Sequence, residues 1–130
     1  MTRNAITEGP GLAAPLGPFS RAVWAGELLY VSGQTGVNPA SGALPPGGDV
    51  AAETRQVLDN LAAVLAAAGL SFADVIKANV FLADMGDFRT MNAIYAEAFD
   101  EPRPARTTIG VAALPGGARV EIELVARKAG

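Results

Sequence analysis

The sequence contains neither cysteine nor histidine among its 130 residues. Disulfide bonds, thiolate nucleophiles and catalytic relays that depend on histidine are therefore excluded. The usual nitrogen and sulfur ligands of zinc are missing as well, so we expect no metal site. Any chemistry must use arginine, lysine, carboxylate or hydroxyl side chains.

Long apolar stretches and an excess of positive charge are also missing. The apolar stretch from Leu61 to Ala68 is far shorter than the roughly 20 residues that span a bilayer. Residues 1–18 lack the continuous apolar core of a signal peptide, so we expect a soluble, cytoplasmic protein without a membrane partner. Ten basic residues against 13 acidic ones give a net charge of −3, which disfavours nucleic acid as a partner.

Hydrophobic residues make up 50% of the sequence, which suffices for one ordinary core. We therefore expect a single domain over residues 1–130. Glycine and proline concentrate in residues 1–18 and 33–48. This predicts an irregular arm, with at most a short strand near Ile6, and a long loop of the kind that often carries function.

Two segments have the apolar spacing of amphipathic helices. Asp49 is a suitable N-cap for the first helix, which we expect to run from about Val50 to the break at Gly69. Asp87 is the expected cap of the second helix, which must end before Pro102. The apolar stripe of the second helix consists of Phe88, Met91, Tyr95 and Ala98 or Phe99.

Alternating apolar residues predict the strands of a sheet. The strands are expected at 22–24, 28–31, 75–82, 107–111 and 120–125, the first two as a hairpin. In the third, Ile76 is expected to face the core together with Leu82. In the fourth, Ile109 is expected to face the core, which leaves Arg106 on the opposite face.

The expected order is strand, strand, helix, strand, helix, strand, strand. This order indicates an α+β sandwich with a mixed sheet and both helices on one of its faces. No segment of the chain is left to cover the other face. An uncovered apolar face favours self-association, so we expect a homo-oligomer.

Few polar residues stand out as candidates for a site. Asn92 lies beside the apolar stripe of the second helix, and a surface role fits its position equally well. Arg106 is either a surface charge or a fork for an anion. Glu121 and Glu123 occupy the same strand face, and their spacing alone identifies neither as catalytic. The pair Ser32–Gly33 ends a strand and can present a hydroxyl and backbone N–H groups to a ligand.

Six segments resemble, in order and spacing, the reactive intermediate deaminase family, which is also called RidA, YjgF or L-PSP. The most specific are the Pro-Ala-Arg-Thr element that ends at Thr107 and the Val-Glu-Ile-Glu strand that begins at Val120. The resemblance covers nearly the whole chain. The segments are Gly17–Ser20, Tyr30–Gln34, Asn79–Asp84, Met91–Tyr95, Arg103–Thr107 and Val120–Glu123.

The resemblance implies a chorismate-mutase-like α+β fold that forms a homotrimer, with the sheets around a central barrel and ligand clefts between subunits. It also implies an activity. Reactive 2-imino acids of the 2-iminobutanoate and 2-iminopropanoate type, and the enamines in equilibrium with them, would be hydrolysed to 2-keto acids and ammonia. This reaction needs an anchor for the carboxylate and an activated water, so no organic cofactor is expected.

The resemblance further implies roles for individual residues. Arg106 matches the arginine that binds the substrate carboxylate. Glu121 matches the acidic residue that handles the water. Asn92, Ser32 and Gly33 match residues of the substrate cleft.

Two cleft positions depart from the usual pattern of the family. Phe19 stands where many members have tyrosine, and Thr108 stands where some have cysteine. Both are expected to bind substrate and to affect its range more than the fold. Phe19 fits an alternative in which the protein acts on a bulkier, less polar amino-dienoate such as 2-aminomuconate.

Two further alternatives stay open. A non-catalytic member that binds metabolites or acts as a chaperone needs Arg106 but has less use for Glu121. An endoribonuclease, an activity attached to the family name, is disfavoured by the net charge of −3 and by the absence of histidine.

The distance between the two principal residues favours a site shared by two subunits. If the strands around Arg106 and Glu121 form a hairpin that turns near Gly116, Arg106 lies opposite Val125. Glu121 is then about four residues away at ~3.3 Å each, too far for one small substrate. We therefore expect the cleft to combine Arg106 of one subunit with Glu121 of another.

Overall fold

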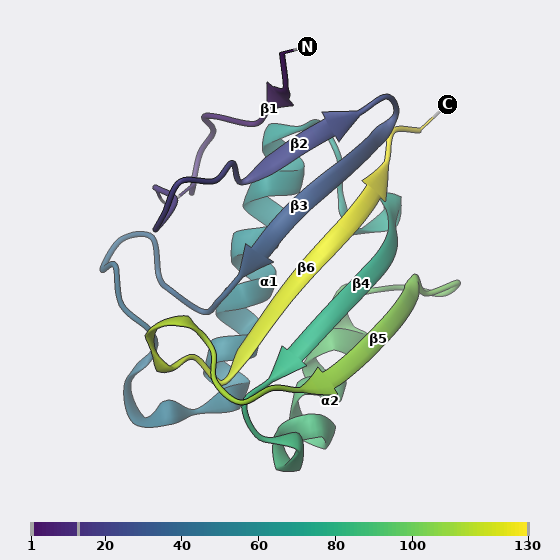
Figure 1. The fold of residues 1–130 in the computed structure, drawn as a ribbon. Coiled ribbons are helices and arrows are strands. Elements are labelled where there is room, and N and C mark those ends of the chain that lie inside the picture. The colour runs from purple at the N-terminus through teal and green to yellow at the C-terminus, as the bar shows by residue number, and fades with distance from the viewer. Residues whose placement is uncertain (1, 13, 130) are drawn as a thin grey trace.

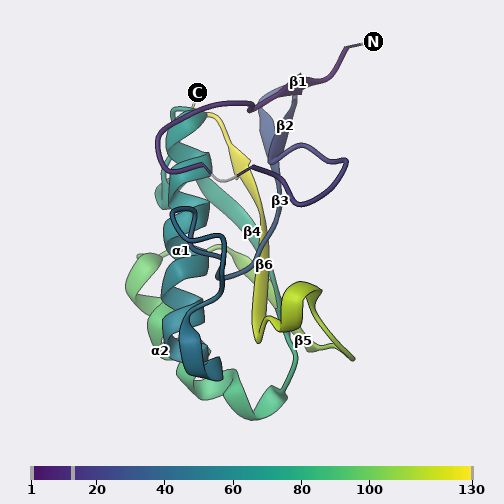
Figure 2. The same ribbon diagram turned by 90° about the vertical axis from the view of Figure 1, so that its left-hand side faces the viewer.

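The computed structural model describes residues 2–12 and 14–129. In this part of the chain, six strands form one sheet in the order β1-β2-β3-β6-β4-β5, and two helices pack against one of its faces (Figures 1 and 2). The predicted α+β architecture is confirmed. The strands are β1 (Asn4–Ala5), β2 (Ala22–Ala25), β3 (Leu28–Gln34), β4 (Val75–Leu82), β5 (Ala105–Gly110) and β6 (Val120–Arg127), and the helices are α1 (Val50–Ala67) and α2 (Phe88–Ala98).

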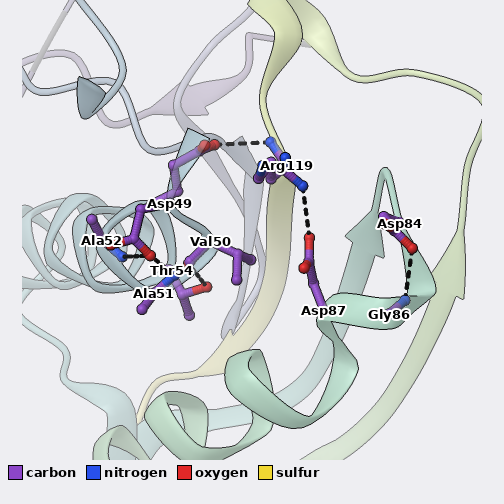
Figure 3. A network of polar contacts seen from close by, with 10 residues as sticks. Asp49, Val50, Ala51, Ala52, Thr54, Asp84, Gly86, Asp87 and Arg119 are labelled. Atoms are coloured by element: carbon purple, nitrogen blue, oxygen red, sulfur yellow. Dashed lines mark hydrogen bonds and ion pairs between the residues drawn. The ribbon is translucent and has the colours of Figure 1, made fainter. Parts of the chain in front are cut away.

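The first helix, α1, begins and ends where the sequence predicts it. Asp49 Oδ1 accepts hydrogen bonds from the backbone N–H groups of Ala51 (2.9 Å) and Ala52 (3.5 Å), which forms the N-cap (Figure 3). Gly69 follows the last turn with a φ of +77°, a conformation that favours glycine. The buried stripe of α1 includes Val57, Leu58, Leu61, Val64 and Leu65.

Asp87 stands at the predicted N-cap position of α2, but its side chain does not cap the helix. A 3₁₀ turn from Met85 to Asp87 runs directly into α2, so Asp87 already has a helical backbone and its carboxylate caps no N–H group. Asp87 Oδ2 instead pairs with Arg119 Nη1 at 3.2 Å (Figure 3). The turn itself is capped by Asp84, whose Oδ1 accepts a hydrogen bond from the N–H of Gly86 at 2.8 Å.

The last two strands do not pair with each other. β5 lies at the edge of the sheet, parallel to β4, while β6 lies between β3 and β4 and is antiparallel to both. The hairpin considered for the strands around Arg106 and Glu121 is therefore not formed. Because α2 carries the chain from β4 to the parallel strand β5 on one side, the other side of β4 is free to pair with β6.

Several side chains lie on the face opposite to the predicted one. Arg106 of β5 is aligned with Ala78 of β4, which is fully buried beneath the helices, so Arg106 faces α2 and not the open face. Ile109 consequently points away from the helices and is 46% exposed. An irregular register at the start of β4 buries Val75 and turns Ile76 outward.

The hydrophobic core lies between the two helices and the sheet. Alternate residues of β6 and β4 face the helices and are fully buried, among them Ile122 and Val80. The opposite face of the sheet is covered by neither helix (Figure 2). Tyr30, Ile76 and Ile109 are large apolar or aromatic side chains that stay exposed on the strands.

Candidate functional site

Three residues assigned to the cleft line one cavity. Phe19, Gly33 and Glu121 surround a cavity of about 550 Å³, formed by the N-terminal arm, the end of β3 and the loop that follows it. A carboxylate therefore lies in a largely apolar recess. The apolar side chains of the lining include Leu12, Pro15, Leu16, Val37, Pro39 and Val64.

Gly33 lets the Glu121 carboxylate approach the backbone of β3. A Cβ at this position would lie 2.6 Å from Glu121 Oε2 and 2.8 Å from Glu121 Cδ, distances that side-chain atoms do not tolerate. Glycine is thus required for Glu121 to hold its present position.

Ser32 connects β3 to the segment that carries Phe19. Its Oγ donates a hydrogen bond of 2.6 Å to the backbone carbonyl of Ser20, and its N–H donates to the carbonyl of Arg21 at 2.8 Å. The hydroxyl proton is therefore engaged within the chain, and the oxygen lone pairs are the part of Ser32 left for a ligand.

Glu121 and Glu123, which the sequence could not separate, differ in their surroundings. Glu123 Oε2 accepts a hydrogen bond from Asn79 Nδ2 at 3.0 Å. Among the described residues, no side chain donates to the Glu121 carboxylate. Burial, and secondly the charge of Glu123, raise the pKa of Glu121 above its ordinary value. A carboxylate with a raised pKa beside a cavity is suited to accept and return a proton.

Arg106 belongs to a second cluster, between β5 and α2. Its Cζ lies 4.7 Å from the ring centroid of Tyr95 and 5.8 Å from that of Phe88. The ion pairs among the described residues involve other arginines, Arg103 and Arg119. No described carboxylate pairs with Arg106, so its N–H donors are available to an anion.

Buried polar atoms without partners accompany Arg106. Asn92 Oδ1, Tyr95 Oη and Thr108 Oγ1 are all buried, and no described residue hydrogen-bonds to them. Asn92 and Tyr95 lie one turn apart on α2, while Thr108 lies two residues after Arg106 on the same side of β5. Buried polar groups are normally paired, so these unpaired atoms make the cluster around Arg106 a candidate site.

Tyr95 is the nearer of the two aromatic contacts of Arg106, and neither contact was predicted from the sequence. A tyrosine in the apolar stripe of a helix fits a core role, and Tyr95 is indeed buried. Its position three residues after Asn92, on the same side of the helix, was the available signal.

The two clusters lie on opposite faces of the sheet. Arg106 is aligned with Ala78 of β4 on the helix side, whereas Glu121 is aligned with Phe81 of β4 and alternates with the buried Ile122. Because β4 lies between β5 and β6, Arg106 and Glu121 are two strand spacings apart across the sheet. Their partners on β4, Ala78 and Phe81, are three residues apart along the strand, so the Cα atoms of Arg106 and Glu121 are roughly 14 Å apart. One small ligand cannot contact both side chains of the same chain.

Among the described residues, no group of three or more acidic side chains could hold a metal ion. No helix in residues 2–12 and 14–129 is long and apolar enough to cross a membrane.

Comparison with known proteins identifies relatives over most of the chain. A family model described as endoribonuclease L-PSP matches residues 11–128. A Bos taurus protein named 2-iminobutanoate/2-iminopropanoate deaminase is 51% identical over 126 residues, which cover 97% of this chain and 90% of the relative.

Two crystal structures have the same fold. RidA from the Antarctic bacterium Psychrobacter sp. PAMC 21119 is 39% identical, with a TM-score of 0.89 and coverage of 95% of this chain and 99% of the other. TdcF from E. coli, solved with bound serine, is 37% identical, with a TM-score of 0.89 and coverage of 97% and 100%. The matched region, residues 11–128, contains both clusters. Because the family model and these relatives match most of the chain, the protein belongs to the L-PSP family, also called RidA or YjgF.

Proposed function

We propose that this protein is a deaminase that hydrolyses 2-imino acids of the 2-iminobutanoate and 2-iminopropanoate type to 2-keto acids and ammonia. The relative from Bos taurus carries this activity in its name. The observation in this chain that supports it most directly is the Arg106 guanidinium, which pairs with no described carboxylate. A planar guanidinium grips a carboxylate through two parallel N–H···O bonds, and every 2-imino acid carries that carboxylate.

We further propose that the active site forms between subunits of a homotrimer. Arg106 and Glu121 of one chain face opposite sides of the sheet, so one substrate can meet both only if they come from different chains. The open face of the sheet supplies a surface for assembly. Light scattering coupled to gel filtration tests this proposal, and a stable monomer would contradict it.

In the proposed mechanism, Arg106 binds the substrate carboxylate, and Glu121 of the neighbouring subunit accepts and donates the protons. Glu121 takes a proton from water as the water oxygen bonds to the imine carbon, and passes that proton to the nitrogen. It then takes the hydroxyl proton of the resulting carbinolamine. The nitrogen receives this proton as the C–N bond breaks, which releases ammonia and the 2-keto acid.

The remaining cleft residues are proposed to shape and bind the substrate. Asn92 and Thr108 each bring a buried polar atom without a described partner to the Arg106 side. Ser32 and Gly33 present the end of β3 to the Glu121 side, and Phe19 is proposed to form an apolar wall.

A larger substrate is a second candidate within the same reaction class. The cavity beside Glu121 has a volume of about 550 Å³ and is lined mostly by apolar groups. The size and apolar lining of this cavity suit a substrate larger than the smallest imino acids, and so does Phe19 in place of a tyrosine. An amino-dienoate is therefore the alternative substrate. The protein is proposed to act in the cytoplasm without a metal ion or organic cofactor.

A substrate panel separates these functions. An amino-acid oxidase generates each imino acid in place, and the release of 2-keto acid is followed with and without the protein. We expect faster release from 2-iminobutanoate and 2-iminopropanoate. Binding of 2-keto acids without acceleration of any imine would instead indicate a non-catalytic binder. Cleavage of RNA in a parallel assay would indicate an endoribonuclease, which the net charge of −3 disfavours.

A further inference from the structure

The ring of Tyr95 is fixed within an aromatic stack. Tyr95 is 4% exposed, and its ring stacks on Phe99 with centroids 4.4 Å apart and planes at 28°. Phe99 is 1% exposed and in turn meets the ring of Phe72 edge-on, with centroids 4.9 Å apart. Because each ring supports the next, α2 presents Tyr95 as a rigid platform.

The guanidinium of Arg106 lies against this platform. Its distance of 4.7 Å from the Tyr95 centroid is well within cation–π range, whereas Phe88, at 5.8 Å, is near the limit of roughly 6 Å. Arginine has many rotamers, and ordering such a side chain during binding lowers affinity. A partner that holds the guanidinium before the ligand arrives removes that loss.

Tyr95 attracts the guanidinium without occupying its N–H donors. A carboxylate in the same place would take two donors and neutralise the charge. A ring face attracts the cation and leaves the donors for a ligand. Burial raises the pKa of Tyr95, although the charges of Arg106 and Arg103 act against this, so the hydroxyl stays protonated at neutral pH and brings no competing negative charge.

We propose that Tyr95 is a positioning residue for Arg106: its ring holds the guanidinium with its N–H donors turned to the substrate carboxylate. This inference rests on the proposed function, because it takes Arg106 as the carboxylate anchor. It gives Tyr95 a second role besides filling the core.

Three variants test the role of the ring. Tyr95→Leu removes the aromatic face, Tyr95→Phe keeps it and removes only the hydroxyl, and Phe72→Leu removes another ring of the same stack that does not contact Arg106. The measurements are the Kd of 2-oxobutanoate by titration calorimetry, KM and kcat for 2-iminobutanoate, and the midpoint of thermal unfolding. If Tyr95→Leu does not fold, Tyr95→Met provides the same comparison with a non-aromatic side chain.

We expect Tyr95→Leu to raise both the Kd and KM about three- to thirtyfold, the range of one cation–π contact, and to change kcat less than threefold. Tyr95→Phe should keep the Kd within about twofold of the wild-type value. Phe72→Leu should lower the midpoint of thermal unfolding and keep the Kd within about twofold of the wild-type value.

Three results would overturn the inference: an unchanged Kd in Tyr95→Leu, an equal loss in Tyr95→Phe, or an equal loss in Phe72→Leu. The second would assign the effect to the hydroxyl, and the third to general loosening of the core. A failure of the proposed function gives a different result, because the wild-type protein would then bind 2-oxobutanoate without accelerating imine hydrolysis. In that case the comparison of Kd values would still decide the role of Tyr95.

Discussion

Replacing Gly33 with alanine tests whether the Glu121 carboxylate reacts from the place it now holds. The added Cβ would lie 2.6 Å from Glu121 Oε2, whereas ordinary contacts begin at 3.4 Å, so the carboxylate must move by about 0.8 Å or more. Oε2 is the end of a flexible side chain, and Gly33 does not have a positive φ. The backbone can therefore stay in place, and we expect the fold to be retained.

A displacement of this size at a reacting group lowers turnover by about 10²-fold. We expect kcat for 2-iminobutanoate to fall by roughly that factor, with KM changed much less because Arg106 belongs to the other cluster. In the double variant Gly33→Ala/Glu121→Gln, activity should equal that of Glu121→Gln alone, because the group that alanine displaces is already inactive. Turnover of Gly33→Ala within threefold of the wild type would show that Glu121 does not need its present position for catalysis.

Three further predictions concern charge and capping. Arg106→Lys keeps the charge but not the two parallel bonds, so the Kd of 2-oxobutanoate in calorimetry should rise about ten- to hundredfold; an unchanged Kd would make Arg106 a surface residue. Because the pKa of Glu121 is raised in the folded chain, its proton stabilises the fold at low pH, and this contribution is lost as the pH rises through the raised pKa. Thermal unfolding of Glu121→Gln should thus show a larger gain over the wild type near pH 8 than near pH 4, and equal gains would contradict the shift. Asp49→Ala removes the N-cap of α1 and should lower the free energy of unfolding in urea by about 1 kcal/mol.

Elements with strong local signals were predictable from the sequence. The cap at Asp49, the apolar period of α1 and the stop at Gly69 all agree with the observed helix. The hairpin of β2 and β3 around Gly26 is likewise as predicted, because its turn is encoded by neighbouring residues.

The side of the sheet that Arg106 faces could not be predicted. Alternation in β5 separates Arg106 and Thr108 from Thr107 and Ile109, but the open face of this sheet also carries apolar residues. The apolar side chain of Ile109 therefore gave no reliable sign of the core face. Pairing of β6 with β3 and β4 joins residues far apart in sequence, and no local pattern encodes it.

The sequence named candidate site residues, but it did not show which of them contact one another. The resemblance to the family singled out Glu121 and Gly33 separately, while their contact depends on β3 and β6 being neighbours. The difference between Glu121 and Glu123 depends on Asn79, which β4 brings to Glu123. Neither relation follows from spacing along one strand.

The place of β6 in the sheet also determines when this protein can fold during its synthesis. β1, β2 and β3 form one half of the sheet and β4 and β5 the other, and only β6 joins them. Since β6 is the last of these strands to leave the ribosome, the two halves cannot join into one sheet until residue 127 has emerged. Until then the apolar faces of both helices lack part of their cover. Long-range pairing of this kind is slow to form. Apolar surface of the nascent chain therefore stays exposed up to that moment, which favours contacts with other chains.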